Sequence, residues 1–303
     1  MAKIIISILL FVSINSCAQF PLFHAHNVIL ASPKLLDLYP NSEVALSLRK
    51  IRNNYTGSVI KVRRDSDSTF MNILFLNDIL DTATLKTFVG SGSGYISEWY
   101  DQSIGTYRSA IQTDTSLQPI IIRNGIIYRE GLFPAIRFEN GKYLRFEGIA
   151  ADTSTRISTF VAAKLTSNYS GYSRLLSFNP DQIMYIGTNS SNQVATFYGN
   201  GLSWGLVSAQ SSNSWLNNWL LVTTINNGND NQYINNVFIS SRSNSVQYNK
   251  SAKSTANLFI GGYFNNMGQE WYGTLSEVVM YFKDRSSERA GIENNINSFY
   301  LIY

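Results

Sequence analysis

The feature that most constrains the fold is a long series of short β-rich runs in residues 95–282. Apolar, β-branched and aromatic residues gather in runs such as Arg156–Leu165, Trp219–Ile225 and Leu275–Phe282. Clusters of Gly, Asn, Ser and Asp separate these runs at intervals of about a dozen residues, which is typical of antiparallel sandwiches. The sequence therefore predicts an all-β fold.

Three segments depart from this β pattern. We expect a short helix over Ala45–Tyr55 and a second over Leu80–Val89, where apolar residues recur at helical spacing and Asp81 or Thr82 can cap the first turn. Ser286–Tyr303 predicts a C-terminal helix that begins with a capping serine. The expected fold is a β-sandwich with short N-terminal helices and a C-terminal helix.

The N-terminus has the pattern of an export signal. Lys3 supplies a positive charge, and the apolar run Ile4–Ile14 is too short for an ordinary transmembrane helix. Two cleavage sites are compatible with it. The stretch Ile14–Cys17 is similar to a lipoprotein box, which would place a lipid on Cys17, whereas Ser16–Ala18 suits ordinary signal peptidase. Both predict an exported protein, either secreted or lipid-anchored at the cell envelope.

Composition then limits the mature chain. Cys17 is the only cysteine of the sequence, so no disulfide is expected in the mature domain. The net charge is +4 and its basic residues are scattered, which does not favour nucleic-acid binding. We expect an export signal over residues 1–18, an N-terminal extension over residues 19–42 and one domain over residues 43–303.

Several motifs of the first half occur in a recognisable order: Ala45–Arg49, Tyr55–Gly57, Val62–Asp67, Asp81–Leu85, Phe88–Gly90, Trp99–Ser103 and Gln118–Pro119. In this order they resemble the N-terminal half of the α-L-arabinofuranosidase B catalytic-domain family. The second half, with Phe259–Gly262 and Trp271–Gly273, resembles concanavalin A-like and laminin-G-like lectin domains. Both resemblances imply a jelly-roll sandwich. Within Trp99–Ser103, turn chemistry alone predicts that Asp101 binds backbone amides.

The resemblance also implies where catalytic carboxylates belong. In that family a nucleophilic Glu precedes an Ile-Tyr-Leu-Gly strand, and an acid/base Asp follows a Gly-Gly strand end. The matching positions here hold Gln182 and Tyr263, and neither is a carboxylate. Asp181 and Glu270 lie nearby in the sequence and are the candidates for a displaced pair, because glycoside hydrolysis normally needs two carboxyl groups.

Aromatic residues in polar surroundings are the positive signal for glycan binding. Tyr198, Trp204, Tyr263 and Trp271 lie among Asn, Ser, Gln and Gly, and rigid rings with nearby amides suit the apolar faces and hydroxyl edges of sugars. The alternative for Trp271 is a core residue near a strand end.

Other chemistries are less well supported. His24 and His26 form a His-x-His without an acidic or cysteine partner nearby, so a flexible tail is favoured over a metal pair. Asp65 and Asp67 are the calcium candidates, but they lack the spaced oxygen ligands of a dedicated loop. We expect no cofactor.

Three functional hypotheses follow. The leading one is an exported carbohydrate-binding protein that recognises arabinose-containing or other extracellular polysaccharide without an intact catalytic pair. The second is an α-L-arabinofuranosidase with a displaced carboxylate pair, and the third is a cell-surface adhesion protein. The sandwich alone does not choose among them, because function depends on the site.

Anchoring gives the first test. If Cys17 carries a lipid, Cys17→Ala releases the protein from the membrane fraction, because the acyl chains that hold it there are lost. Fractionation and mass spectrometry of the mature N-terminus measure this. A wild-type protein that is already released, with Gln19 at its N-terminus, would show ordinary signal-peptidase cleavage instead.

Overall fold

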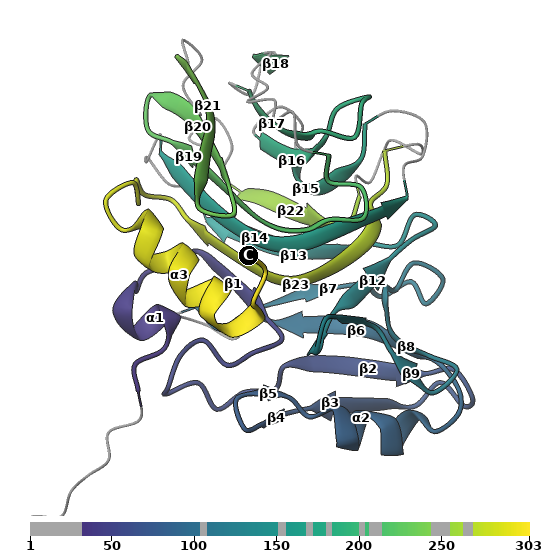
Figure 1. Ribbon diagram of the computed structural model, residues 1–303. Helices are drawn as coiled ribbons and strands as arrows, with labels where there is room; N and C mark the ends of the chain where they lie inside the picture. The colour runs from purple at the N-terminus through teal and green to yellow at the C-terminus, as the bar shows by residue number, and fades with distance from the viewer. Residues whose placement is uncertain are drawn as a thin grey trace, which may run out of the picture. The chain divides into compact units, whose positions relative to one another are not determined.

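Two central strands, β14 (Ile157–Ser167) and β23 (Tyr272–Tyr281), pair along most of their length in the computed structural model (Figure 1). The structure describes residues 32–103, 108–150, 156–167, 172–179, 184–199, 204–205, 214–243, 255–262 and 269–303. The compact unit runs from Pro33 to Tyr303 and includes Leu35 and Leu36, which sequence patterning placed in an extension.

The first layer of the fold is built outward from this pair. On one side the order is β14, β19, β20 and β21, and on the other side β23 pairs with both β1 and β12. The remaining bounds are β1 (Val44–Ser47), β12 (Ile136–Phe138), β19 (Trp219–Asn226), β20 (Asn229–Ile234) and β21 (Val237–Ser243).

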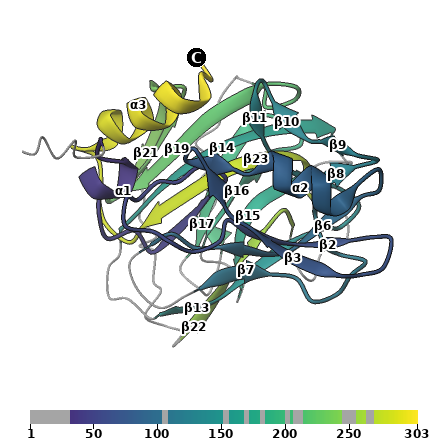
Figure 2. The same cartoon turned by 90° about the horizontal axis from the view of Figure 1, so that it is seen from below.

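The second layer faces the first (Figures 1 and 2). Its order is β13, β22, β15, β16, β17 and β18, all antiparallel. These strands are β13 (Leu144–Ala150), β15 (Arg174–Asn179), β16 (Met184–Thr188), β17 (Val194–Gly199), β18 (Trp204–Gly205) and β22 (Thr255–Ile260).

Further strands join the two layers into one hydrogen-bonded sheet that folds over on itself. They are β2 (Ile60–Arg64), β3 (Phe70–Ile73), β6 (Gly94–Tyr100), β7 (Ser109–Ile111), β8 (Ile120–Arg123) and β9 (Ile126–Ile127). Two small hairpins complete the described strands: β4 (Phe75–Leu76) with β5 (Ile79–Leu80), and β10 (Arg129–Glu130) with β11 (Phe133–Pro134). The prediction of an all-β sandwich is confirmed.

Apolar residues fill two separate cores. The larger core lies between the layers and includes Val161, Val222 and Ile260. The smaller core lies on the outer face of the first layer, where Phe160 and Val279 pack against α1 (Leu35–Leu38) and α3 (Arg289–Tyr300). Among the described residues, no helix has the length and apolarity needed to cross a membrane.

Two of the expected helices are present. α2 (Thr82–Val89) begins where Asp81 accepts hydrogen bonds from the backbone amides of Ala83 and Thr84, as predicted. The C-terminal helix α3 starts at Arg289, later than expected, because the hydroxyl of Ser286 binds Asp284 in the preceding turn.

The helix expected over Ala45–Tyr55 is wrong. Residues Val44–Ser47 form β1, which pairs with β23 and is buried along its whole length. Val44 and Leu46 face the core between the layers, whereas Ala45 faces the outer core. A strand buried on both faces has a continuous apolar run, and periodicity cannot distinguish such a run from a buried helix.

A buried ion pair ties β1, β23 and α3 together. The guanidinium of Arg49 donates to Glu277 Oε2 at 2.7 Å and to Oε1 at 3.0 Å, and it donates to Asn295 on α3 at 3.0 Å. Ser47 Oγ also donates to Glu277 Oε2 at 2.7 Å. Both charges are therefore satisfied by partners on different elements, and loss of one leaves the other buried alone.

Arg49→Leu should lower the free energy of unfolding by about 3–5 kcal/mol, because it leaves the Glu277 carboxylate buried without its cation. Denaturant unfolding followed by circular dichroism measures this. The double variant Arg49→Leu/Glu277→Leu should recover most of the loss. A single variant as stable as the wild type would contradict the structural role of the pair.

Candidate functional site

The predicted site residues fall in different parts of the chain. Cys17, Asp181, Gln182 and Tyr263 lie outside the described residues, as do the two N-terminal histidines. The backbones of Tyr198 and Trp204 belong to β17 and β18, but their side chains are outside the description. Glu270 and Trp271 are therefore the predicted residues whose side chains can be placed.

Trp271 is a core residue, which is the second of the two interpretations that the sequence allowed. Its side chain has no exposed surface. Its ring lies 4.7 Å from that of Trp215 in an edge-to-face arrangement, and the Trp215 indole donates to the carbonyl of Ala163 at 3.0 Å. Burial between the layers gives a large indole more stabilisation than a polar loop offers, and the sequence pattern did not separate the two cases.

Glu270 lies two residues before the start of β23, next to Trp271. The Trp271 amide donates to the carbonyl of Gly261 at 3.0 Å, which fixes this segment beside the end of β22. The Oε2 atom of Glu270 is buried and has no hydrogen-bond partner among the described residues. The carboxylate of Glu270 also approaches the turn at Gly141. A Cβ atom built on this glycine would lie 3.9 Å from Oε1 of Glu270. A buried carboxylate oxygen without a partner requires an explanation, and a bound ligand or water molecule is one.

Aromatic and polar side chains surround this strand end on the outer face of the second layer. Phe259, Ser177 and Tyr185 lie side by side in register across β22, β15 and β16. The ring of Tyr143 lies 5.6 Å from that of Phe259. Ser177 Oγ donates to the carbonyl of Gly262 at 3.0 Å, which links the row to the segment that carries Glu270.

The row ends in a buried tyrosine beneath a cation. The guanidinium of Arg174 lies 4.6 Å above the ring of Tyr185. Burial raises the pKa of the Tyr185 hydroxyl far above its ordinary value, and the nearby Arg174 charge offsets only part of this. Tyr185 is therefore a neutral hydrogen-bonding group over the physiological pH range. Arg174 and Ser177 carry no separate signal in the sequence, because their proximity depends on strand register.

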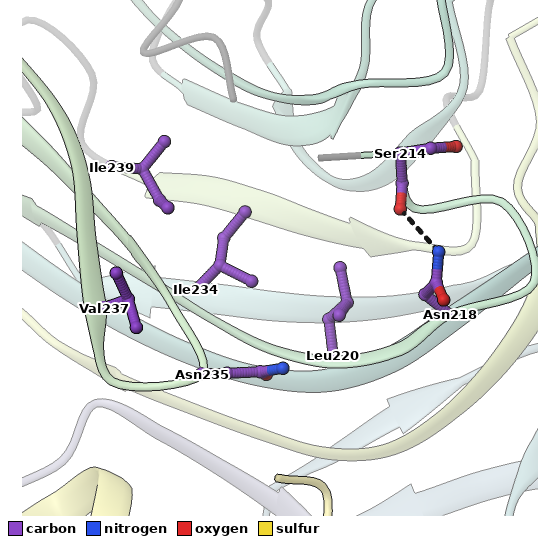
Figure 3. Close-up of a pocket in the computed structure, with 7 residues that line it drawn as sticks. All are labelled: Ser214, Asn218, Leu220, Ile234, Asn235, Val237 and Ile239. Atoms are coloured by element: carbon purple, nitrogen blue, oxygen red, sulfur yellow. Dashed lines mark hydrogen bonds between the residues drawn. The ribbon is translucent and has the colours of Figure 1, made fainter. Parts of the chain in front are cut away.

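A pocket of about 520 Å³ opens on the inner face of the first layer (Figure 3). Apolar side chains of β19, β20 and β21 form its wall: Leu220, Ile234, Val237 and Ile239. Ser214, Asn218 and Asn235 supply its polar groups. The amide of Asn218 donates to the carbonyl of Ser214 at 2.9 Å and so holds this turn in place. None of these described lining residues is charged.

Asp67, one of the two calcium candidates, is held by hydrogen bonds within its own turn. Arg64 donates to both carboxylate oxygens of Asp67, at 2.8 and 2.5 Å, and the backbone amide and hydroxyl of Thr69 donate to Oδ1. The Arg64 hydrogen bonds, followed by those of Thr69, hold the pKa of Asp67 well below its ordinary value. Asp67 therefore closes a turn. Among the described residues, no group of three or more metal-ligating side chains comes together.

Asp101 behaves as turn chemistry predicted. Its Oδ1 accepts from the backbone amides of Ala45 at 2.7 Å and Ser103 at 3.1 Å. Trp99 is fully buried and Tyr100 partly exposed, so the two rings alternate across β6. The motif that carried much of the resemblance thus has a structural role in joining β6 to β1.

Comparison with solved structures finds arabinofuranosidases. One, in complex with arabinofuranosyl-α-1,2-xylobiose, is 18% identical, covers 87% of this chain and has a TM-score of 0.61. Two GH54 α-L-arabinofuranosidase structures, a mutant soaked with 4-nitrophenyl α-L-arabinofuranoside and an enzyme soaked with a cyclic sulfate inhibitor, are each 17% identical, cover 89% of this chain and have a TM-score of 0.63.

These likenesses concern the fold. The chain spans 64% of the length of the first structure and 66% of each of the other two. No protein-family model matches the sequence, and no curated protein matches it by sequence.

Trp271→Ala should lower the free energy of unfolding by about 3–5 kcal/mol, because it removes a buried indole and leaves a cavity beside Trp215. Denaturant unfolding measures the loss, and Trp271→Phe should restore part of it. A Trp271→Ala protein of unchanged stability that has lost glycan binding would return Trp271 to the ligand site.

Proposed function

We propose that this protein acts on arabinofuranosyl units of an extracellular polysaccharide as a glycoside hydrolase, with Glu270 as one of its carboxyl groups. The observation that supports this most is the partnerless Oε2 of Glu270 beside the end of β22. The resemblance to the arabinofuranosidase B family implies an acid/base carboxylate directly after this strand end, where Tyr263 stands, so Glu270 would supply it from a displaced position. The fold likeness to arabinofuranosidases over most of the chain is the second support.

In this proposal Glu270 donates a proton to the leaving oxygen of the glycosidic bond. A second carboxyl group must attack the sugar or activate water on its opposite side. Asp181 is the proposed partner, on sequence grounds alone. The partly exposed ring of Tyr143, which packs against the buried ring of Phe259, offers apolar surface to the C–H face of a sugar.

Binding without cleavage is the second candidate. It is favoured by the amide of Gln182 and the hydroxyl of Tyr263, which stand where the resemblance implies carboxylates. An amide cannot replace a carboxylate nucleophile, and an ordinary tyrosine is a poor proton donor at neutral pH. In this case the protein holds the polysaccharide on a concanavalin- or laminin-G-like sandwich.

Export completes the proposal. A polysaccharide substrate lies outside the cell, and the signal pattern of residues 1–18 would bring the protein to it. Attachment through Cys17 would keep the protein at the envelope, whereas cleavage after Ala18 would release it.

Purified protein should hydrolyse 4-nitrophenyl α-L-arabinofuranoside, and Glu270→Gln should lower kcat/KM by about 10²–10⁴-fold, because general acid catalysis is lost. Release of nitrophenol measures the rate. Glu147→Gln is the matched control, since Glu147 lies exposed on β13 and pairs with Arg145.

Two outcomes would reject hydrolysis. Turnover that is equal in Glu270→Gln and Glu147→Gln would remove Glu270 from the reaction. No turnover by the wild-type protein, together with measurable binding to arabinan, would establish the second candidate.

A further inference from the structure

The sheet face that carries the proposed site continues beyond β13 onto further strands. β13 pairs with β7, β7 with β6, β6 with β2 and β2 with β3, so the hydrogen-bonded sheet is unbroken from β22 to β3 (Figure 1). Directly paired residues lie on one face of a sheet. From Phe259 the register passes in turn through Arg145, Ile111, Glu98, Lys61 and Asn72. These side chains therefore share one face, away from the larger core.

A pocket of about 280 Å³ opens on this face over β2 and β6. Lys61, Phe70, Glu98, Ile111 and Thr113 are among the described residues that line it. Phe70 is 50% exposed, and Lys61 Nζ lies 5.6 Å from the centre of its ring. The pocket therefore joins an exposed aromatic surface to a pair of opposite charges.

Buried amides fix the shape of this pocket. Gln118 Oε1 accepts from Arg63 Nε at 2.8 Å, and Gln118 Nε2 donates to the carbonyl of Gln112 at 3.0 Å. The Gln112 amide in turn donates to the carbonyl of Tyr143 at 3.2 Å. Both glutamines line the pocket and are at most 6% exposed. The pocket is thus formed before a ligand arrives, and Gln112 joins it to Tyr143 at the proposed site.

The charge pair keeps hydrogen-bonding capacity for a ligand. Lys61 Nζ donates to Glu98 Oε1 at 3.0 Å, and Ser109 Oγ donates to Glu98 Oε2 at 3.4 Å. The two charged side chains are 36% and 26% exposed. An ammonium group has three donors and a carboxylate about four acceptor sites, so these bonds use only part of the capacity. Because the pair is neutral as a whole, it suits an uncharged ligand that carries both donors and acceptors.

We propose that this pocket is a distal subsite, which binds a further sugar unit of the polysaccharide chain that reaches Glu270. The sugar packs its C–H face on Phe70, and its hydroxyls bind the Lys61 ammonium and the Glu98 carboxylate. Neighbouring strands are about 4.8 Å apart, so Glu98 on β6 lies about 14 Å along the sheet from Phe259 on β22. A polymer can bridge that span, whereas a single sugar cannot. This assignment of the ligand rests on the proposed function.

Two substrates separate the subsite from the reaction at Glu270. Arabinan can occupy both places, whereas 4-nitrophenyl α-L-arabinofuranoside occupies only the one at Glu270. Phe70→Ala should raise KM for arabinan by about five- to tenfold and leave kcat unchanged, because only binding of the chain is weakened. The kcat/KM for the aryl glycoside should stay at the wild-type level. Phe238→Ala is the matched control, since Phe238 is 54% exposed on β21 in the other layer.

Glu98→Gln should raise KM for arabinan in the same way, because an amide is a weaker acceptor than a carboxylate and no longer holds Lys61 in place. Asp78→Asn is its control, since Asp78 forms a similar pair with Lys34, with 2.6 Å between Nζ and Oδ2. Thermal unfolding should give the charge variants melting temperatures close to that of the wild type, because exposed ion pairs contribute little to stability.

Equal KM values for arabinan in Phe70→Ala and Phe238→Ala would overturn the proposal. A parallel loss of aryl-glycoside turnover in Phe70→Ala would overturn it as well, because the variant would then damage the fold or the reacting centre. If the wild type hydrolyses neither substrate, calorimetry with arabinan decides. Weaker binding by Phe70→Ala than by Phe238→Ala would reject hydrolysis and keep the subsite, whereas equal or absent binding would reject both.

Discussion

β23 is the strand on which the rest of the structure depends. It pairs with β14 on one edge and with β1 and β12 on the other, and successive residues face different cores. Val278 and Met280 fill the space between the layers, whereas Val279 and Tyr281 lie beneath α3. Glu277 binds Arg49 and so fastens β1 to the same strand. Because both faces of β23 are buried, this one strand supports both the interior of the sandwich and the attachment of the C-terminal helix.

The same alternation links the scaffold to the proposed site. Trp271, just before β23, enters the core against Trp215, and its neighbour Glu270 remains half-buried beside the end of β22. The core residue thus holds the segment that presents the carboxylate. In the first layer, apolar contacts with α1 and α3 close the outer face, and the inner face carries the pocket of Figure 3. The two faces of this layer therefore differ: the outer face packs against helices, and the inner face lines a pocket.

Local chemistry made much of the fold predictable. Period-two runs identified the strands, and Asp81 marked the start of α2 because a cap acts within three residues. Burial on both faces concealed β1, since its apolar run has the same pattern as a buried helix. The site was less accessible to such reasoning. Phe259, Ser177 and Tyr185 are spread over three strands, and only register brings them into one row.

The most direct test of this account is a crystal structure of the Glu270→Gln protein soaked with a short arabino-oligosaccharide. The account predicts sugar beside the end of β22, with a glycosidic oxygen within hydrogen-bond distance, about 2.7–3.0 Å, of the side chain of residue 270. Sugar bound only elsewhere on the protein, with no sugar beside residue 270, would contradict it.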